Sequence, residues 1–168
     1  MSYRNKTYVA FDGDRDIHYY RLMTAWKQND GIAFNFSNAH DLNYAYDSSQ
    51  EQSIKNQLRE RLLNSKIFVL LVGERTRYLT KFVLWEIEQS LSLNLPIICV
   101  NLNGLREMDS ERCPPALKDK LAVHISFNAA IMQQALENWP NSHDAYKNSS
   151  DKISPYFYKK EVYDRLGL

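Results

Sequence analysis

Two apolar runs, Ile67–Val72 and Ile97–Leu102, of which only the second contains a polar residue (Asn101), constrain the fold of this chain more than any other feature. A strand that is exposed on one face alternates apolar and polar residues, whereas a strand that is buried on both faces is apolar throughout. Strands of the second kind belong to parallel sheets that are covered by helices on both faces. The two runs therefore predict an α/β protein with three layers.

The remaining segments alternate in the way that such a sheet requires. Hydrophobic patterning and turn residues predict strands at 6–11, 32–36, 66–72, 97–102 and 123–127. Helices are predicted at 16–29, at about 48–64, at about 80–93, at 116–120 and at 129–139. The order is typical of a flavodoxin-like three-layer sandwich with a five-stranded parallel sheet. A chain of 168 residues fits one such domain, predicted here as residues 1–139.

The composition changes at Pro140, where Asn, Ser, Lys and Tyr become frequent. Residues 140–168 are interpreted as an aromatic-rich C-terminal extension that carries the run Pro155-Tyr156-Phe157-Tyr158 before a short helix. Aromatic side chains at this density rarely stay in solvent. We expect the extension to pack on the domain or on a partner chain.

Charge and cysteine usage exclude several classes of partner. The formal net charge is +1 and basic residues are interspersed with acidic ones, so we expect no binding to nucleic acid or to an anionic membrane. No apolar stretch approaches the length of a membrane span. Two cysteines, Cys99 and Cys113, with no signal peptide before them favour the reducing cytoplasm. No His/Cys spacing predicts a metal site.

Candidate binding residues lie where strands end. Phe11 and Asp12 end the first strand, although a core aromatic and a helix cap are equally good readings of these two residues. The long polar loop 37–50 is of a length that is often functional. The turn that begins at Gly73 could hold a phosphate on its backbone amides. The loop supplies four further candidates: Ser37, Asn38, His40 and Asp41.

Glu86 and Glu88 are the candidate carboxylates of the helix that follows the third strand. The periodicity places Val83, Leu84, Ile87 and Leu91 on the buried stripe of this helix, with one glutamate on each shoulder of the stripe. Periodicity alone therefore favours a solvated surface position for both. Phe82 lies four residues before Glu86, on the same shoulder.

The segment from Leu62 to Ile87 resembles the TIR-like domain family, particularly members from the Thoeris antiphage system. The resemblance rests on Ile67–Val72, on the Gly73 turn and on an aromatic four residues before the glutamate, and it covers roughly residues 6–127. Phe82 stands where the family usually has tryptophan. The family's first motif is similar to Thr7–Asp12.

The resemblance implies an enzyme that cleaves the bond between nicotinamide and ribose in NAD, with Glu86 as the catalytic residue. NAD would be the substrate, and no cofactor would be required. Some family members cyclise the product into a messenger of the cyclic ADP-ribose type, which activates an antiviral effector. The resemblance also implies self-association in the active state. Phe11, Asp12, Phe82 and the loop 37–41 would shape the pocket.

The sequence leaves two other classes of function open. A non-catalytic TIR-type adaptor would act through protein–protein contacts alone. A receiver-like nucleotide-binding module would need an acidic pair after the first strand and an aspartate at the end of the third. Asp12 and Asp14 supply the pair, but the third strand ends at Val72-Gly73, which weakens this reading.

Overall fold

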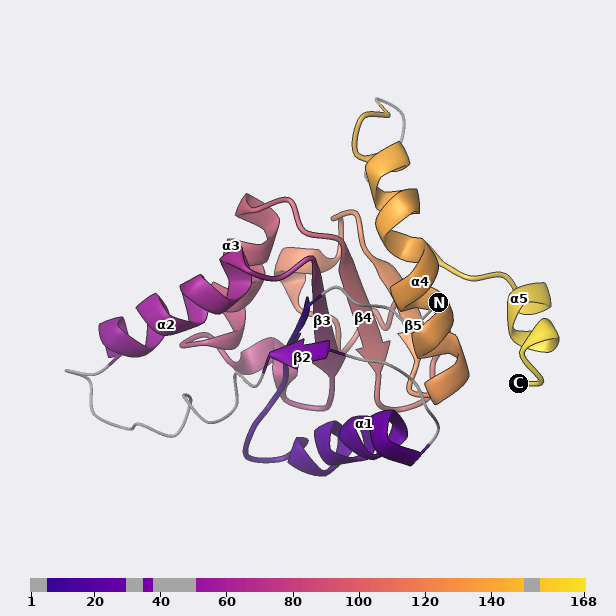
Figure 1. Cartoon of the computed structure of the whole chain (residues 1–168), viewed down its shortest axis with the longest axis horizontal. Coiled ribbons are helices and arrows are strands. Elements are labelled where there is room, and N and C mark those ends of the chain that lie inside the picture. The colour runs from indigo at the N-terminus through magenta and orange to yellow at the C-terminus, as the bar shows by residue number, and fades with distance from the viewer. Residues whose placement is uncertain (1–5, 30–34, 38–50, 150–154) are drawn as a thin grey trace.

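The computed structural model describes residues 6–29, 35–37, 51–149 and 155–168, arranged around one parallel sheet (Figure 1). The strands are β1 (Lys6–Ala10), β2 (Asn35–Ser37), β3 (Ile67–Val72), β4 (Ile97–Asn101), β5 (Val123–Ser126) and β6 (Tyr156–Phe157). The α-helices are α1 (Ile17–Asn29), α2 (Glu51–Leu63), α3 (Val83–Ser92), α4 (Ala129–Tyr146) and α5 (Lys160–Arg165). Two 3-10 turns, η3 (Thr76–Tyr78) and η4 (Pro115–Leu117), complete the set.

The sheet has the strand order β2-β1-β3-β4-β5-β6, and every pairing is parallel. The predicted α/β fold with five parallel strands is therefore confirmed, and the C-terminal segment adds the short edge strand β6. The order reverses between β1 and β3, because β1 leads to β2 on one side and β3 leads to β4 on the other. In this type of fold, ligands bind at the carboxyl ends of the strands near such a reversal.

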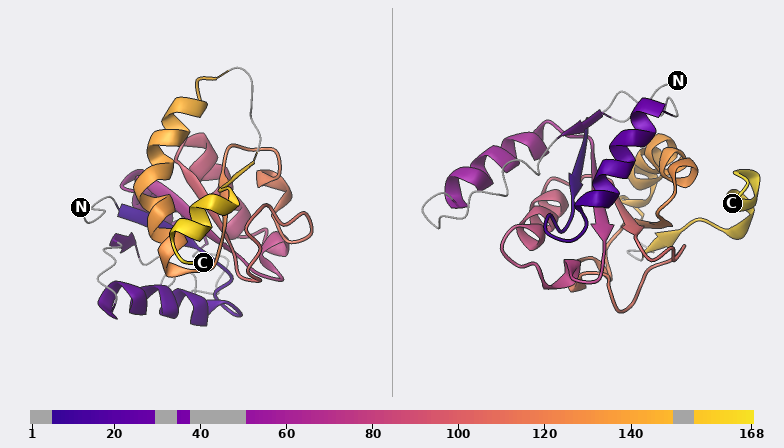
Figure 2. Two further views of the ribbon diagram at one scale, coloured as in Figure 1. Left: turned by 90° about the vertical axis from the view of Figure 1, so that its right-hand side faces the viewer. Right: turned by 90° about the horizontal axis from the view of Figure 1, so that it is seen from below.

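The two apolar runs face helices on both sides, as their composition predicts. Val69 and Val100 point into a core that α1 and α4 cover, whereas Phe68 and Cys99 point into a second core that α2 and α3 cover. The view from below in Figure 2 places α2 and α3 on one side of the strands and α4 on the other. Alternate residues of each central strand therefore stabilise opposite layers.

The helix that carries Glu86 begins later than the sequence predicts. The amide of Leu84 donates to the carbonyl of Leu79, five residues earlier, rather than to Thr80. Regular α-helix therefore starts only at Val83, after the turn η3. The predicted helix at 116–120 is likewise wrong, because the segment forms only the three-residue turn η4 after Pro114.

Helix α4 continues through Pro140, although the sequence predicts its end at Trp139. A proline inside a helix removes one backbone hydrogen bond and is normally unfavourable. The turns beyond it carry His143, which is 3% exposed, and Tyr146, whose ring stacks on Tyr156 with centroids 4.6 Å apart. The burial of His143 and the contact of Tyr146 with the C-terminal segment offset the lost bond, which is why the predicted helix end is wrong.

The C-terminal segment is anchored to the sheet by Tyr163 of α5. Its side chain is fully buried in the core that α1 and α4 cover. Its hydroxyl accepts a hydrogen bond of 3.3 Å from the amide of Ser126, at the carboxyl end of β5. The guanidinium of Arg106 lies 4.2 Å from the centre of the ring. Helix α5 is thus part of the core despite its position at the rim (Figure 2).

Candidate functional site

Glu86 lies in the first turn of α3 and is 1% exposed. The helix buries four side chains, namely Val83, Glu86, Ile87 and Ser90. Leu84 and Leu91 are only partly buried, so the predicted position of Glu86 on the shoulder of the apolar stripe is wrong. The reason is that α3 packs against α2 as well as against the sheet. At the contact between the two helices, Lys55 of α2 lies over the ring of Trp85 of α3. Glu88 is exposed.

The carboxylate of Glu86 is held by Tyr8 of β1. The Tyr8 hydroxyl donates a hydrogen bond of 2.5 Å to Oε2 of Glu86, and both side chains are buried. Oε1 of Glu86 has no hydrogen-bond partner among the residues that the structure describes. Side chains alternate along β1, which places Tyr8 on the face covered by α2 and α3 and therefore opposite Glu86.

Burial raises the pKa of Glu86 to about 7, although the hydrogen bond from Tyr8 acts in the opposite direction. Burial likewise raises the pKa of Tyr8 far above its ordinary value, with the charge of Glu86 adding to the effect and Arg61 opposing it. Tyr8 therefore stays a proton donor at physiological pH, whereas Glu86 changes its charge near neutrality. Its place in the first turn of a helix favours the charged form.

Phe82 precedes α3 and lies one helical turn before Glu86, partly buried against the same core. The ammonium group of Lys81 lies 5.4 Å from the centre of the Phe82 ring, at the surface end of this turn. The structure therefore places Phe82 and Glu86 on the same side of the sheet.

Phe11 belongs to the opposite face. It is 6% exposed in the core that α1 and α4 cover, and its ring stacks on Tyr20 with centroids 4.9 Å apart. Asp12 is 4% exposed, and its Oδ1 accepts a hydrogen bond of 3.1 Å from the amide of Asp14. The structure thus does not bring Phe11 to Glu86, and Asp12 organises the turn after β1.

The second-strand loop is only partly described. Ser37 is the last residue of β2, and its backbone pairs with Tyr8 of β1, one strand away from the hydroxyl that holds Glu86. Asn38, His40 and Asp41 lie outside the described residues.

A cavity of about 290 Å³ opens at the carboxyl ends of β1, β3 and β4. Its polar lining includes Arg15, Asp16, Arg75 and Arg112, and Asp16 packs so closely on Gly73 that a Cβ there would lie 2.2 Å from its carboxylate. The amide of Gly73 already donates to the Thr76 hydroxyl, so it is not free for a phosphate as the turn suggests. Asp16 and Arg112 come from separate loops, which is why the sequence did not single them out.

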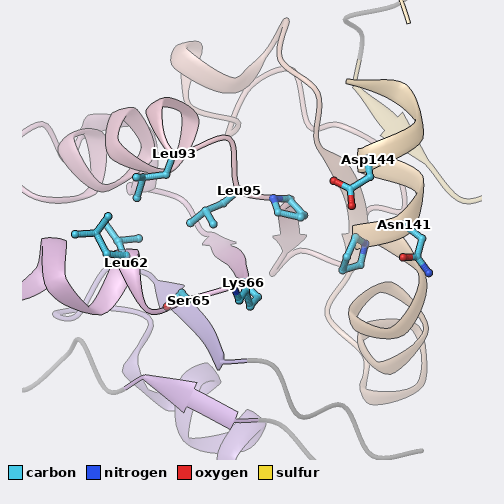
Figure 3. A pocket seen from close by; sticks show the side chains of 10 residues that line it. Leu62, Ser65, Lys66, Leu93, Leu95, Asn141 and Asp144 are labelled. Carbon is cyan, nitrogen blue, oxygen red and sulfur yellow. The ribbon is translucent and has the colours of Figure 1, made fainter. Parts of the chain in front are cut away.

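A second cavity, of about 490 Å³, lies at the opposite end of the sheet (Figure 3). Leu62 and Lys66 near the start of β3, Leu95 before β4 and Asp144 of α4 contribute to its lining. Because ligands of this fold bind at the carboxyl ends of the strands, this cavity is not part of the candidate site.

Neither a metal cluster nor a membrane helix accompanies the site in the part of the chain that the structure describes. Within those ranges no group of three or more His, Cys, Asp or Glu side chains is placed to hold a metal ion. None of the helices there is long and apolar enough to cross a bilayer.

Comparison with protein families bears directly on the region that holds the site. A family model described as Thoeris protein ThsB, TIR-like domain, matches residues 8–107. The match begins at Tyr8, includes Phe82 and Glu86, and ends in the loop after β4. It covers more than half of the chain, and the chain therefore belongs to the TIR-like domain family of the Thoeris protein ThsB.

Proposed function

We propose that this protein cleaves the bond between nicotinamide and ribose in NAD and joins the ADP-ribosyl product to itself as a cyclic messenger. The proposal rests on one observation above all. A glutamate of α3 in the family-matched region is buried, and one of its oxygens is fixed by a buried tyrosine hydroxyl. NAD is the substrate, and no further cofactor takes part.

The chemistry requires a negative charge close to the ribose. When the glycosidic bond breaks, its electron pair stays on the ring nitrogen, and the pyridinium becomes neutral nicotinamide without needing a proton. The ribose becomes a cation of the oxocarbenium type, which an adjacent carboxylate stabilises. Attack by an adenine nitrogen on the cationic ribose carbon closes the ring and transfers the positive charge to the adenine, whereas attack by water gives linear ADP-ribose and releases a proton. A carboxylate that binds the charge only in the transition state contributes about 10²- to 10³-fold in rate.

The environment of Glu86 supports this role. A charge in a poorly solvated site acts more strongly on a neighbouring cation than the same charge in water. Burial also raises its pKa to about 7, so the reactive anion is abundant at the slightly alkaline end of the physiological range. Because Glu86 is 1% exposed, NAD binding has to displace groups that cover it.

In the cell, we propose that the cyclic product carries the signal to an antiviral effector of the Thoeris system. The site acts in the cytoplasm, and self-association of the chain accompanies the active state. The messenger links the two proteins, so no direct contact with the effector is needed.

The same burial favours a second candidate, a non-catalytic TIR-type adaptor. A protonated glutamate that accepts a hydrogen bond from Tyr8 is also a satisfactory structural pair, and Glu86 is not among the residues lining the cavities described above. Such a protein would act through surface contacts and would leave NAD intact.

Product analysis separates the two candidates. Purified wild-type protein, Glu86→Gln and Glu88→Gln are incubated with NAD over a range of protein concentrations, and the products are resolved by chromatography with mass detection. Protein from infected cells is included so that an activating signal is not missed. We expect nicotinamide and a product with the mass of cyclic ADP-ribose from wild type and Glu88→Gln, and neither from Glu86→Gln. Intact NAD in every sample would establish the adaptor instead.

A further inference from the structure

The two oxygens of the Glu86 carboxylate have different surroundings. Oε2 accepts the 2.5 Å hydrogen bond from the Tyr8 hydroxyl, whereas Oε1 is buried without a hydrogen-bond partner among the described residues. A buried polar atom without a partner is costly and is found mainly where a function requires it. The hydrogen bond to Oε2 therefore fixes the orientation of the carboxylate, and Oε1 can accept a hydrogen bond from a ligand.

The anchor itself is rigid. Tyr8 is fully buried, and its ring stacks on Phe68 of β3 with centroids 5.8 Å apart and planes 19° from parallel. Its backbone pairs with Ser37 of β2 on one side and with Phe68 on the other. Because two neighbouring strands and a ring stack hold Tyr8 in place, its hydroxyl has a fixed position. The hydrogen bond from this hydroxyl therefore fixes the position of Oε2.

The charged groups on the neighbouring elements do not replace this anchor. Arg61 of α2 acts on Tyr8 through its positive charge, and its Nη1 is buried without a partner among the described residues. The other cations nearby, Lys55 of α2 and Lys81 before α3, lie over Trp85 and Phe82 and also pair with Glu51. Tyr8 thus makes the one hydrogen bond recorded for the Glu86 side chain within the described ranges.

We propose that Tyr8 is the positioning residue of the NAD-cleaving site, and that it anchors Oε2 of Glu86 so that Oε1 is the oxygen presented to the ribose. This inference rests on the proposed function of Glu86. Tyr8 touches neither substrate nor leaving group. It acts by orienting the carboxylate and by stabilising its charged form, since a hydrogen bond to an anion favours ionisation.

Tyr8→Phe removes the hydroxyl and keeps the ring. The carboxylate loses a donor to its charged form, so the pH at which Glu86 ionises should rise by about one to two units. The acid limb of the pH profile of kcat should move to higher pH by the same number of units. KM should change little, because the anchor does not bind NAD, and much of the lost kcat should return at alkaline pH.

The matched control is Tyr163→Phe. Tyr163 is also fully buried, and its hydroxyl also makes one recorded hydrogen bond, but to the amide of Ser126 on the other face of the sheet. This variant should lose stability to a similar degree and keep the wild-type pH profile. A general effect of removing a buried hydroxyl would change both variants alike.

The experiment has two readouts. Carbon-13 NMR of selectively labelled glutamate side chains gives the ionisation midpoint of Glu86 in wild type, Tyr8→Phe and Tyr163→Phe, with Glu86→Gln assigning the signal. Initial rates of nicotinamide release give the pH dependence of kcat and KM. An upward shift of both the Glu86 midpoint and the acid limb in Tyr8→Phe alone supports the proposal. An unchanged midpoint, or a Tyr8→Phe protein whose kcat equals that of wild type at every pH, overturns it.

A second variant covers the case in which Tyr8→Phe does not fold. Site-specific 3-fluorotyrosine at position 8 keeps the hydroxyl and makes it a stronger donor, so the midpoint of Glu86 should fall; an unchanged or raised midpoint overturns the proposal. The NMR readout does not depend on turnover. If wild type leaves NAD intact while the midpoint still responds to Tyr8, the proposed function fails and the anchoring contact stands. If NAD is cleaved but the ionisation midpoint of Glu86 does not change with the Tyr8 variants, only the positioning role of Tyr8 is overturned.

Discussion

Replacing Glu86 with glutamine should stabilise the protein at alkaline pH, because the native fold holds this carboxylate in an environment that disfavours its charge. Burial raises the pKa of Glu86 from its ordinary value of 4.5 to about 7. The folded state therefore binds more protons than the unfolded state between these two values, and stability falls as pH rises through them. The shift corresponds to about 3 kcal/mol, since one pKa unit is about 1.4 kcal/mol.

Another buried group acts in the opposite direction. Burial lowers the pKa of His124 from 6.5 to about 4, so the unfolded state binds more protons there and stability rises with pH across that range. In wild type the two contributions partly cancel. The quantity to compare is therefore the difference in unfolding free energy between Glu86→Gln and wild type, in which the effect of His124 drops out.

Urea unfolding followed by tryptophan fluorescence at pH 5, 6, 7 and 8 provides this difference. Glutamine cannot ionise, so the difference should move in favour of Glu86→Gln by about 2–3 kcal/mol between pH 5 and pH 8. Glu88→Gln, which changes an exposed glutamate of the same helix, should show no such trend. A pH-independent difference for Glu86→Gln would refute the reasoning, because it would mean that the buried carboxylate ionises as it does in water.

Three further changes test other parts of the structure. Gly73→Ala should cost about 1–3 kcal/mol in urea unfolding, because its Cβ would lie 2.2 Å from the Asp16 carboxylate, and Asp16→Ala in the same chain should recover most of the loss; equal loss in the double variant would contradict the contact. Tyr163→Ala should cost about 3–5 kcal/mol in a single transition, since this ring is fully buried; a separate early transition would mean that α5 is not part of the cooperative fold. Wild type should lose up to about 3 kcal/mol of stability through His124 between pH 6.5 and pH 4, and His124→Gln should remove this loss in the same unfolding assay. A difference from wild type that stays constant over this range would mean that His124 ionises in the fold as it does in the unfolded chain.

The central sheet could be predicted because its signal is local. Ile67–Val72 is apolar at every position, and Ile97–Asn101 is apolar at every position but the last. A strand with this composition must be covered on both faces. The end of α4 could not be predicted in this way. Pro140 is a strong local signal to stop, and it is overridden by the burial of His143 and by the stacking of Tyr146 on Tyr156 of the C-terminal segment.

The candidate site was predicted only in part for the same reason. The family resemblance selected Glu86, but periodicity placed it on a shoulder of α3, since the pattern cannot register that α2 covers that side. Tyr8 looks like one more apolar residue of a buried strand. Its role appears only when β1 and α3, which are 78 residues apart in sequence at this contact, face each other across the core.

The central claim is that the charge of Glu86 stabilises the cationic ribose in the transition state. Its most direct test is kcat for nicotinamide release at saturating NAD and pH 8, measured for wild type, Glu86→Gln and Glu88→Gln. We expect Glu86→Gln to lose about 10²- to 10³-fold or more in kcat and Glu88→Gln to remain close to wild type. A Glu86→Gln protein that turns over NAD at the wild-type kcat would contradict the claim.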